Sequence, residues 1–369
     1  MPKAHFLSIL VAAAGASVGA RPHAASAPIP TTVDSSCVAA LDSLRVVFQR
    51  DYPGYRDKVT GHQAALAALT DSVRAVARTS DKHEVCIPAL KRWARFFRDG
   101  HVAGPWQAGP PAPPPAPSAS AAAPTGPPAD DPARPSLRAL DDSTVLVRLP
   151  TFEGEYKPAI DSFFGANSAR LRTTPYLIVD VRGNGGGYTG SYDSLTPLLY
   201  TNPVHSEGAD VWASARNIAY YRSLADTNFL SPKDQEQMRV VLARMESHVD
   251  QFVEKASDSV MRRDTVYPLP RAVAVLVDSV CASSCEDFLL EARQSAKVTV
   301  LGVTNTAGVH DYGEIHGVWL PGWRRVSLPT TRTRGPRIDN VGLAPGVRIP
   351  RTEPDAVEFA RRYLRRPRP

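Results

Sequence analysis

Residues 272–293, AVAVLVDSVCASSCEDFLLEAR, join an apolar run to a helical one through a short turn that contains Ser283. The run 272–278 is almost entirely apolar, which predicts a strand buried on both faces of a sheet. A serine between such a strand and a helix is held rigidly beside the free backbone N–H groups of the helix start. A nucleophilic serine needs this setting. The alternative is that Ser283 only caps the helix, because serine is a common N-cap residue.

The overall composition is that of an ordinary globular protein. The chain has 369 residues, of which 43% are hydrophobic and 22% charged, enough for one large domain or two smaller ones. The formal net charge is +6, but the basic residues are scattered, with one dense run at 361–368. The sequence has no zinc-finger motif and no basic stripe interleaved with aromatic residues. We therefore expect no nucleic-acid partner.

The N-terminus has the pattern of a secretory signal peptide, predicted to span residues 1–20. Lys3 supplies the positive charge, an Ala-rich apolar run follows at 6–18, and small residues at 18–20 suit a cleavage site. The apolar run is short for a membrane span. We therefore expect an exported protein, periplasmic or extracellular, with no stable membrane insertion after removal of the signal.

The four cysteines suit an oxidising compartment. Cys37 and Cys86 flank a helical region and could join its ends. Cys281 and Cys285 bracket Ser283, and their short spacing leaves open whether they are free or paired. The sequence contains no C-x-x-C pair, so we expect no zinc or other metal site.

Composition and periodicity divide the chain into segments. Residues 34–103 have helical spacing of apolar residues and predict a small helical domain. Residues 104–138 are rich in Pro and Ala and predict a linker. Strand and helix patterns alternate over 139–350, which predicts an α/β core with 205–265 as an inserted helical cap. A C-terminal helix and basic tail follow at 351–369.

A glycine-rich stretch at 180–187, DVRGNGGG, follows another apolar strand at 176–181. Glycines permit positive φ and close backbone approach, and successive N–H groups form an anion nest. An oxyanion or a phosphate would fit such a turn. The absence of a following Lys-Ser/Thr excludes a P-loop. Glycines at 185, 187 and 190 match the dinucleotide fingerprint, but no clean acidic strand end follows, which argues against nucleotide binding.

Three further segments have residue types found at active sites. DGH at 99–101 ends the helical region, NTAGVH at 305–310 follows a predicted strand, and DNVGLAPG at 339–346 lies near the end of the core. Each alone is compatible with ordinary turn chemistry. Together with 180–187 and 283–286, and in this order, they resemble the C-terminal processing peptidases, or tail-specific proteases, and their tricorn-type relatives.

The resemblance implies a mixed β-sheet core of the ClpP/crotonase type with flanking helices, preceded by a small helical domain. It also implies a serine endopeptidase that works through an acyl-enzyme on Ser283. The oxyanion hole would be formed by the backbone N–H of Ser284 and that of Gly186 or Gly187. The family commonly carries a PDZ module, but the proline-rich stretch 104–140 has no room for one.

Two histidines could serve as the general base. The processing branch uses a lysine where this chain has Val309, and no lysine follows Lys297. The tricorn-type branch uses a histidine that matches His101, whose unperturbed pKa suits proton abstraction near neutral pH. His310 is an alternative base.

An acidic side chain would orient the second nitrogen of the base. Asp339 corresponds to the glutamate that the tricorn-type branch uses, and Asp99 is a second candidate.

Two functions from different classes remain compatible with the sequence. The first is a secreted or periplasmic serine endopeptidase with a protein or peptide substrate and no cofactor or metal. The second is a catalytically inactive ligand- or peptide-binding protein on the same fold, suggested by the missing lysine and by Gly346 in place of an acidic residue. The sequence does not indicate an oligomeric state.

Overall fold

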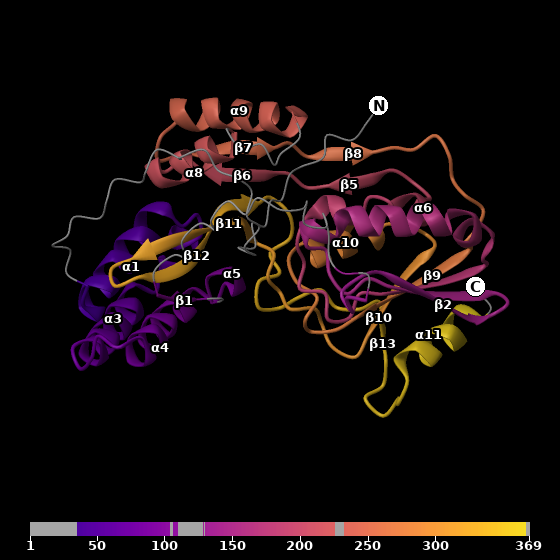
Figure 1. Cartoon of the computed structure of the whole chain (residues 1–369), viewed down its shortest axis with the longest axis horizontal. Helices are drawn as coiled ribbons and strands as arrows, with labels where there is room; N and C mark the ends of the chain where they lie inside the picture. The colour runs from indigo at the N-terminus through magenta and orange to yellow at the C-terminus, as the bar shows by residue number, and fades with distance from the viewer. Residues whose placement is uncertain (1–34, 104–105, 110–127, 129, 226–231, 367–369) are drawn as a thin grey trace, which may run out of the picture.

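The computed structural model describes residues 35–103, 106–109, 128, 130–225 and 232–366 (Figure 1). The expected signal peptide at 1–20 lies outside these ranges, and so do residues 104–105, 110–127 and 129 of the expected linker. Within these ranges, no helix is long and apolar enough to cross a membrane.

A helical region opens the described chain, as predicted. Ser36 caps its first helix by accepting the N–H of Ala39, and the Cys37–Cys86 disulfide joins the first helix to the fourth. Apolar side chains at helical spacing on these helices pack against the hairpin of β11 (Tyr312–Leu320) and β12 (Arg324–Thr333), which anchors the region on the rest of the protein. The helical segments are α1 (Cys37–Asp51), α2 (Tyr55–Val59), α3 (Gln63–Ala77), α4 (His83–Ala94), η1 (Arg95–Phe97) and α5 (Gly100–Ala103).

A six-stranded sheet forms the core, in the order β13-β10-β9-β4-β3-β2. All neighbours are parallel except β2, which is antiparallel to β3. The strands are β2 (Ser136–Asp141), β3 (Thr144–Arg148), β4 (Tyr176–Asp180), β9 (Ala272–Val277), β10 (Val298–Gly302) and β13 (Val347–Arg348).

Helices cover both faces of this sheet, which explains why β4 and β9 are apolar almost throughout. Side chains of α6 (Lys157–Thr173) and α10 (Ser284–Ala292) pack on one face, and those of α11 (Ala356–Leu364) pack on the other. Short segments η2 (Gly154–Tyr156), η3 (Thr189–Tyr192) and α7 (Thr196–Leu199) connect the core elements. The alternation of strand and helix therefore confirms the predicted α/β class.

A second sheet lies between the core and the N-terminal helices (Figure 1). Its order is β1-β12-β6-β7, and β11 pairs with β12; β5 and β8 form a separate two-stranded ribbon. The strands are β1 (Gln107–Ala108), β5 (Val204–Ser206), β6 (Ala209–Trp212), β7 (Phe252–Ala256), β8 (Ser259–Met261), β11 (Tyr312–Leu320) and β12 (Arg324–Thr333).

The inserted segment 205–265 differs from the helical cap expected from its composition. It contains α8 (Ala215–Ala225) and α9 (Pro232–Ser247), but β5, β6, β7 and β8 flank these helices. These strands are three to five residues long, and β6 is stabilised by pairing with the distant β12. Such short strands leave little local signal, because their stability comes from nonlocal pairing. β12, which pairs with β1, β6 and β11, lies inside its sheet.

Candidate active site

Ser283 lies in the turn between β9 and α10 with φ 54° and ψ −123°. A positive φ is unusual for a residue with a side chain and persists only where neighbouring contacts hold it. Here the Ser283 N–H donates to the Val309 carbonyl at 2.9 Å, and the Ser283 carbonyl accepts the N–H of Glu286 at 2.7 Å. Although Ser283 is the N-cap of α10, its hydroxyl makes no capping hydrogen bond. The hydroxyl is therefore not used as a helix cap.

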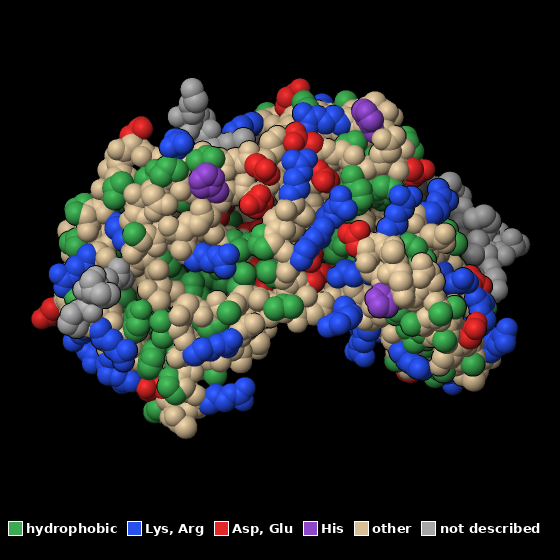
Figure 2. All heavy atoms as spheres, turned by 180° about the vertical axis from the view of Figure 1, so that it is seen from behind, with side chains coloured by type: hydrophobic (Ala, Val, Ile, Leu, Met, Phe, Trp, Pro, Cys, Tyr) green, Lys and Arg blue, Asp and Glu red, His purple; other side chains and the backbone are tan. Residues whose placement is uncertain are grey.

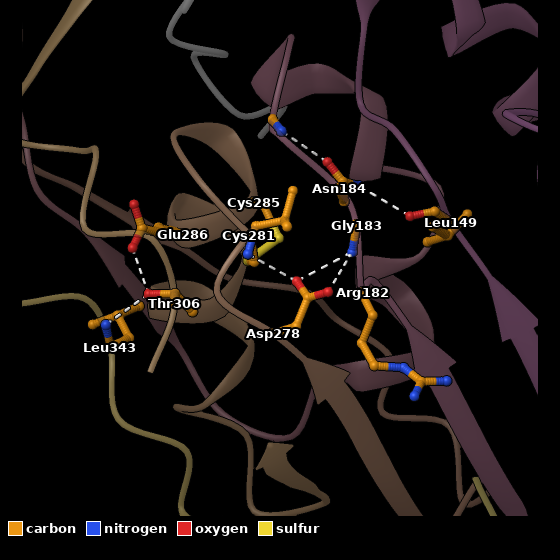
Figure 3. The surroundings of a disulfide bond; sticks show 12 residues. Leu149, Arg182, Gly183, Asn184, Asp278, Cys281, Cys285, Glu286, Thr306 and Leu343 are labelled. Atoms are coloured by element: carbon orange, nitrogen blue, oxygen red, sulfur yellow. Dashed lines mark hydrogen bonds between the residues drawn. A yellow bond between two sulfur atoms is a disulfide. The ribbon is translucent and has the colours of Figure 1, made fainter. Parts of the chain in front are cut away.

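The glycine-rich turn and the Ser283 turn meet because β4 and β9 are adjacent parallel strands. The carboxyl ends of such strands lie at one edge of the sheet. The Asp278 carboxylate joins the two turns, accepting the N–H groups of Gly183 and Val280 at 3.0 Å each (Figure 3). The glycine-rich turn and the Ser283 turn therefore lie side by side.

The glycines of this turn can come close to Ser283 because they lack a Cβ. Gly186 has φ +98°, and a Cβ there would lie 2.6 Å from the Ala282 carbonyl oxygen and 3.0 Å from Ser283 Cβ. Its N–H donates to Asn184 Oδ1 at 2.9 Å. The N–H groups of Gly187 and Ser284 have no hydrogen-bond partner among the described residues. Of the expected oxyanion donors, these two are free in the resting protein.

His101 places an imidazole beside Ser283, although 182 residues separate them. Its Nε2 lies 3.4 Å from Ser283 Oγ, and its side chain is almost fully buried. The segment that carries His101 packs closely against Val309, since a Cβ at Gly100 would lie only 2.5 Å from Val309 Cγ2. Val309 therefore contacts both sides of the pair, through its side chain at Gly100 and through its carbonyl at Ser283. A distance of 3.4 Å is compatible with proton transfer after modest tightening on substrate binding.

Asp99 is the carboxylate next to the imidazole. Asp99 Oδ1 accepts the backbone N–H of His101 at 2.8 Å and lies 3.5 Å from His101 Nδ1. That ring nitrogen is buried and has no hydrogen-bond partner in the described structure. A small rotation of either side chain would complete the hydrogen bond that orients a catalytic histidine.

Asp339 has a different environment from the one expected. Its Oδ1 accepts the backbone N–H groups of His310 and Asp311 at 3.0 and 2.9 Å, and its Oδ2 lies 3.4 Å from Lys58 Nζ. Burial, followed by the charge of Asp99, raises the pKa of the Asp339 carboxyl. Within the described residues, no hydrogen bond or ion pair joins Asp339 to His101. Its contacts hold the 310–311 backbone.

His310 also lines the cleft but is paired elsewhere. Its Nε2 lies 2.7 Å from Asp287 Oδ1, and its side chain is buried. Burial lowers the pKa of His310, but the charge and hydrogen bond of Asp287, helped by the charges of Glu286 and Asp311, outweigh it and raise the pKa above its ordinary value. His310 Nε2 is therefore engaged with Asp287, and no hydrogen bond joins His310 to Ser283 among the described residues.

A buried carboxylate and a disulfide support the turn. Glu286 is fully buried and accepts Thr306 Oγ1 at 2.5 Å and the N–H groups of Gly308 and Val309 at 2.9 Å each. Figure 3 shows the disulfide between Cys281 and Cys285, which spans Ser283 and leaves neither sulfur exposed. Both disulfides that the sequence left open are thus present, and no described cysteine is free.

Ser283 opens into a cleft of about 540 Å³. The ribbon β5–β8, the helix α10 and the start of β11 line it, and charged side chains on its walls include the Lys255–Glu314 ion pair at 2.7 Å. No three His, Cys, Asp or Glu side chains in the described ranges are grouped so that they could hold a metal ion. On the face shown in Figure 2, Lys and Arg side chains are dispersed among Asp and Glu and form no continuous basic stripe.

A serine at a strand-to-helix turn with a histidine beside it, on an α/β core, is an arrangement found in serine-type hydrolases. The chain belongs to peptidase family S41, whose model matches residues 143–338, more than half of its length. It is thus a serine peptidase of that family, as the sequence motifs predicted, and its substrates are proteins or peptides. The match includes Ser283 and the glycine turn, whereas His101 and Asp339 lie outside it. No curated protein matches the chain.

Solved structures of low sequence identity share the fold. Mature CPAF complexed with lactacystin is 14% identical, with a TM-score of 0.59, and the match covers 89% of this chain and 97% of that one. A putative peptidase from Parabacteroides merdae is 14% identical (TM-score 0.53; 90% and 98% covered), and so is a lipoprotein from Streptococcus agalactiae (0.50; 90% and 97%). These matches include the N-terminal helices and confirm the expected mixed α/β fold with a helical N-terminal region.

One residue near the site carried no signal in the sequence. The hydroxyl of Tyr52 donates to Asp99 Oδ2 at 2.8 Å. Tyr52 lies in the first helical hairpin among other aromatic residues, so its pattern predicts only core packing. The two-residue spacing of Asp99 and His101 was the signal that could have favoured Asp99 over Asp339, because Asp side chains commonly bind the N–H two residues later.

Proposed function

We propose that the protein is an exported serine endopeptidase in which Ser283 is the nucleophile and His101 is the general base. The observation that carries this proposal is the 3.4 Å separation of His101 Nε2 and Ser283 Oγ, with Ser283 at positive φ at the mouth of the cleft. Asp99 would orient the imidazole through Nδ1. Asp339 would support the site indirectly, because it holds the backbone of residues 310–311 in place.

In the first half of the reaction, Ser283 Oγ attacks the scissile carbonyl carbon while His101 Nε2 takes the hydroxyl proton. The negative charge that develops on the carbonyl oxygen is stabilised by the N–H groups of Gly187 and Ser284. The intermediate collapses as the C–N bond breaks, and the His101 imidazolium gives its proton to the leaving amine. The product is an ester between Ser283 and the acyl part of the substrate.

In the second half, water replaces the amine. His101 takes a proton from the water as its oxygen attacks the ester carbonyl, and the same two N–H groups stabilise the second oxyanion. The bond to Ser283 Oγ then breaks, and the imidazolium returns the proton to that oxygen. The carboxylic acid product leaves, and every group is restored without a metal or cofactor.

A fluorophosphonate probe tests the nucleophile, with casein or a peptide library as substrate. The wild type should be labelled at Ser283 and Ser283→Ala should not be; Ser279→Ala, an exposed serine on the same turn, is the matched control and should label normally. His101→Ala should reduce labelling and turnover by a factor on the order of 10³ or more, as for other triad histidines. Labelling that persists in Ser283→Ala would exclude Ser283. A wild type that never reacts yet retains a peptide on purification would favour the binding protein.

The export part of the proposal has its own support and test. Both described disulfides are buried, and disulfides persist in oxidising compartments. A mature periplasmic or secreted chain should lack residues 1–20, which N-terminal sequencing of the protein recovered from those fractions would reveal. An intact N-terminus on protein confined to the cytoplasm would contradict export.

A further inference from the structure

Asp99 is held from two sides, and the cleft provides neither contact. One carboxylate oxygen, Oδ1, accepts the His101 backbone N–H at 2.8 Å. The other, Oδ2, accepts the hydroxyl of Tyr52 at 2.8 Å from a position 47 residues earlier in the chain. Asp99 and Tyr52 are each about 2% exposed, so water does not compete for this bond.

The surroundings of Tyr52 fix where its hydroxyl points. The ring packs against Phe48, Phe97 and Tyr312, with centroids 5.4, 5.6 and 5.4 Å away. Gly54 lies directly over the hydroxyl, since a Cβ there would be 2.5 Å from Tyr52 Oη. These contacts restrict the ring and keep its hydroxyl directed at Asp99.

The hydroxyl also stays a donor over the whole working range of pH. Burial, followed by the negative charge of Asp99, raises the pKa of the Tyr52 hydroxyl well above its usual value. The other titratable groups near this pair are Asp339, Lys58, Tyr312 and Asp57: Lys58 and Asp339 are 3.4 Å apart, and the Tyr312 hydroxyl donates to Asp57 at 2.8 Å. Among the described residues, the Tyr52 hydroxyl is thus the side-chain donor to Asp99.

We propose that Tyr52 is a positioning residue for His101, acting through Asp99 from the core of the N-terminal helices. This inference rests on the proposed function, in which His101 is the base. A buried carboxylate that loses one of its two donors is left with an unsatisfied oxygen and is free to rotate. Only the His101 N–H would then hold Asp99, so the carboxylate would be less firmly fixed beside the imidazole, and His101 less firmly oriented toward Ser283.

Loss of the Tyr52 hydroxyl would also change the negative charge that Asp99 presents to the His101 imidazole. Donation by Tyr52 disperses part of the negative charge of Asp99. Without it, more of that charge remains to stabilise the protonated imidazole, so the pKa of His101 should rise. A base with a raised pKa is protonated at higher pH, so activity should be lost at a higher pH on the acid side.

Tyr52→Phe tests the proposal because it removes only the hydroxyl. Near neutral pH, kcat/KM should fall about tenfold with KM within about twofold, since the loss of one buried charge-assisted hydrogen bond misplaces the base. The acid limb of kcat/KM should move up by about half a pH unit. Tyr55→Phe is the matched control: Tyr55 belongs to the same aromatic cluster, but its hydroxyl has no hydrogen-bond partner in the described structure, and both quantities should stay unchanged.

A measurement on the resting protein separates this inference from the proposed function. The pKa of His101, followed by NMR with the resonance assigned by His101→Gln, should be higher in Tyr52→Phe whether or not the protein turns over. A wild type that the probe does not label would refute the proposed function, and the NMR shift would still decide the role of Tyr52. An unchanged His101 pKa and an unchanged pH profile in folded Tyr52→Phe would overturn the inference. Should that variant not fold, Gly54→Ala keeps the hydroxyl but pushes it from Asp99, and the same shift is expected.

Discussion

Replacing Glu286 by glutamine should destabilise the protein although the change is nearly isosteric. The Glu286 side chain is fully buried and accepts three hydrogen bonds. Oε1 accepts from Thr306 Oγ1 and the Gly308 N–H, and Oε2 accepts from the Val309 N–H. A glutamine can keep the first two with its amide oxygen. Its amide nitrogen would then face the Val309 N–H, so that two donors meet and neither is satisfied.

The expected magnitude follows from these three bonds. Two of them change from charge-assisted to neutral, which costs about 1 kcal/mol each, and an unsatisfied buried N–H costs about 1–3 kcal/mol more. Relief from burying a charge offsets part of this loss. We therefore expect Glu286→Gln to lower the free energy of unfolding by about 3 kcal/mol.

Urea unfolding at fixed pH measures the loss, with Glu246→Gln as the control. Glu246 forms a half-exposed ion pair with Arg222, so its substitution should cost less than about 0.5 kcal/mol. Because the Val309 carbonyl holds the Ser283 N–H, probe labelling of Ser283 in Glu286→Gln should also slow by about tenfold or more. A Glu286→Gln protein as stable as the control, with normal labelling, would refute the reasoning.

Three further predictions concern the same region. Asp287→Asn should lower the free energy of unfolding more near pH 5.5 than near pH 8.5. The Asp287 carboxylate raises the pKa of His310 in the folded protein, so their interaction stabilises the fold fully below the ordinary histidine pKa of about 6.5 and is lost as pH rises through the folded-state value. Equal losses at both pH values in urea unfolding would contradict this prediction. Gly100→Ala should slow probe labelling of Ser283 about tenfold, because the added methyl would lie 2.5 Å from Val309 Cγ2. Adding Val309→Ala should remove this clash and restore most of the labelling rate. If the double variant is not rescued, this contact does not set the Ser283–His101 geometry. Replacing both cysteines of the Cys281–Cys285 disulfide by alanine should lower the free energy of unfolding by about 2 kcal/mol, and the same change at Cys37–Cys86 should lower it by about 4 kcal/mol. The difference is expected because the two disulfides close loops with sequence separations of 4 and 49 residues. Similar losses for both in thermal or urea unfolding would count against loop entropy as the cause.

The proposed oxyanion hole shows how much of a site local sequence patterns can predict. The sequence placed the donors among Ser284, Gly186 and Gly187, because a glycine turn and a helix start both expose N–H groups. The choice between the two glycines depends on Asn184, whose Oδ1 accepts the Gly186 N–H. That contact depends on the exact path of the turn, which residue types do not determine.

The proposed acidic partner of His101, by contrast, could not be chosen from local sequence patterns. Asp99 and Asp339 were both compatible with the motifs, and both are buried or nearly so. Backbone N–H groups of residues 310–311 hold Asp339, whereas Asp99 lies beside His101 Nδ1. The two carboxylates come from segments far apart in the chain. Which of the two carboxylates lies beside His101 depends on how the N-terminal helices pack on the β11–β12 hairpin.

The sequence by itself determined the core strands, the Ser283 turn and the glycine turn. Each is signalled locally, by an apolar run followed by residues with special backbone freedom, and the parallel order of β4 and β9 then brings the turns together. Only the tertiary structure brought His101 to Ser283, paired His310 with Asp287 and set Tyr52 against Asp99. These contacts join residues between 23 and 182 positions apart in the chain, and a displacement of about 1 Å at such a site can lower the rate about a hundredfold. Local patterns do not carry that precision, because it arises from the mutual fit of side chains in the folded core.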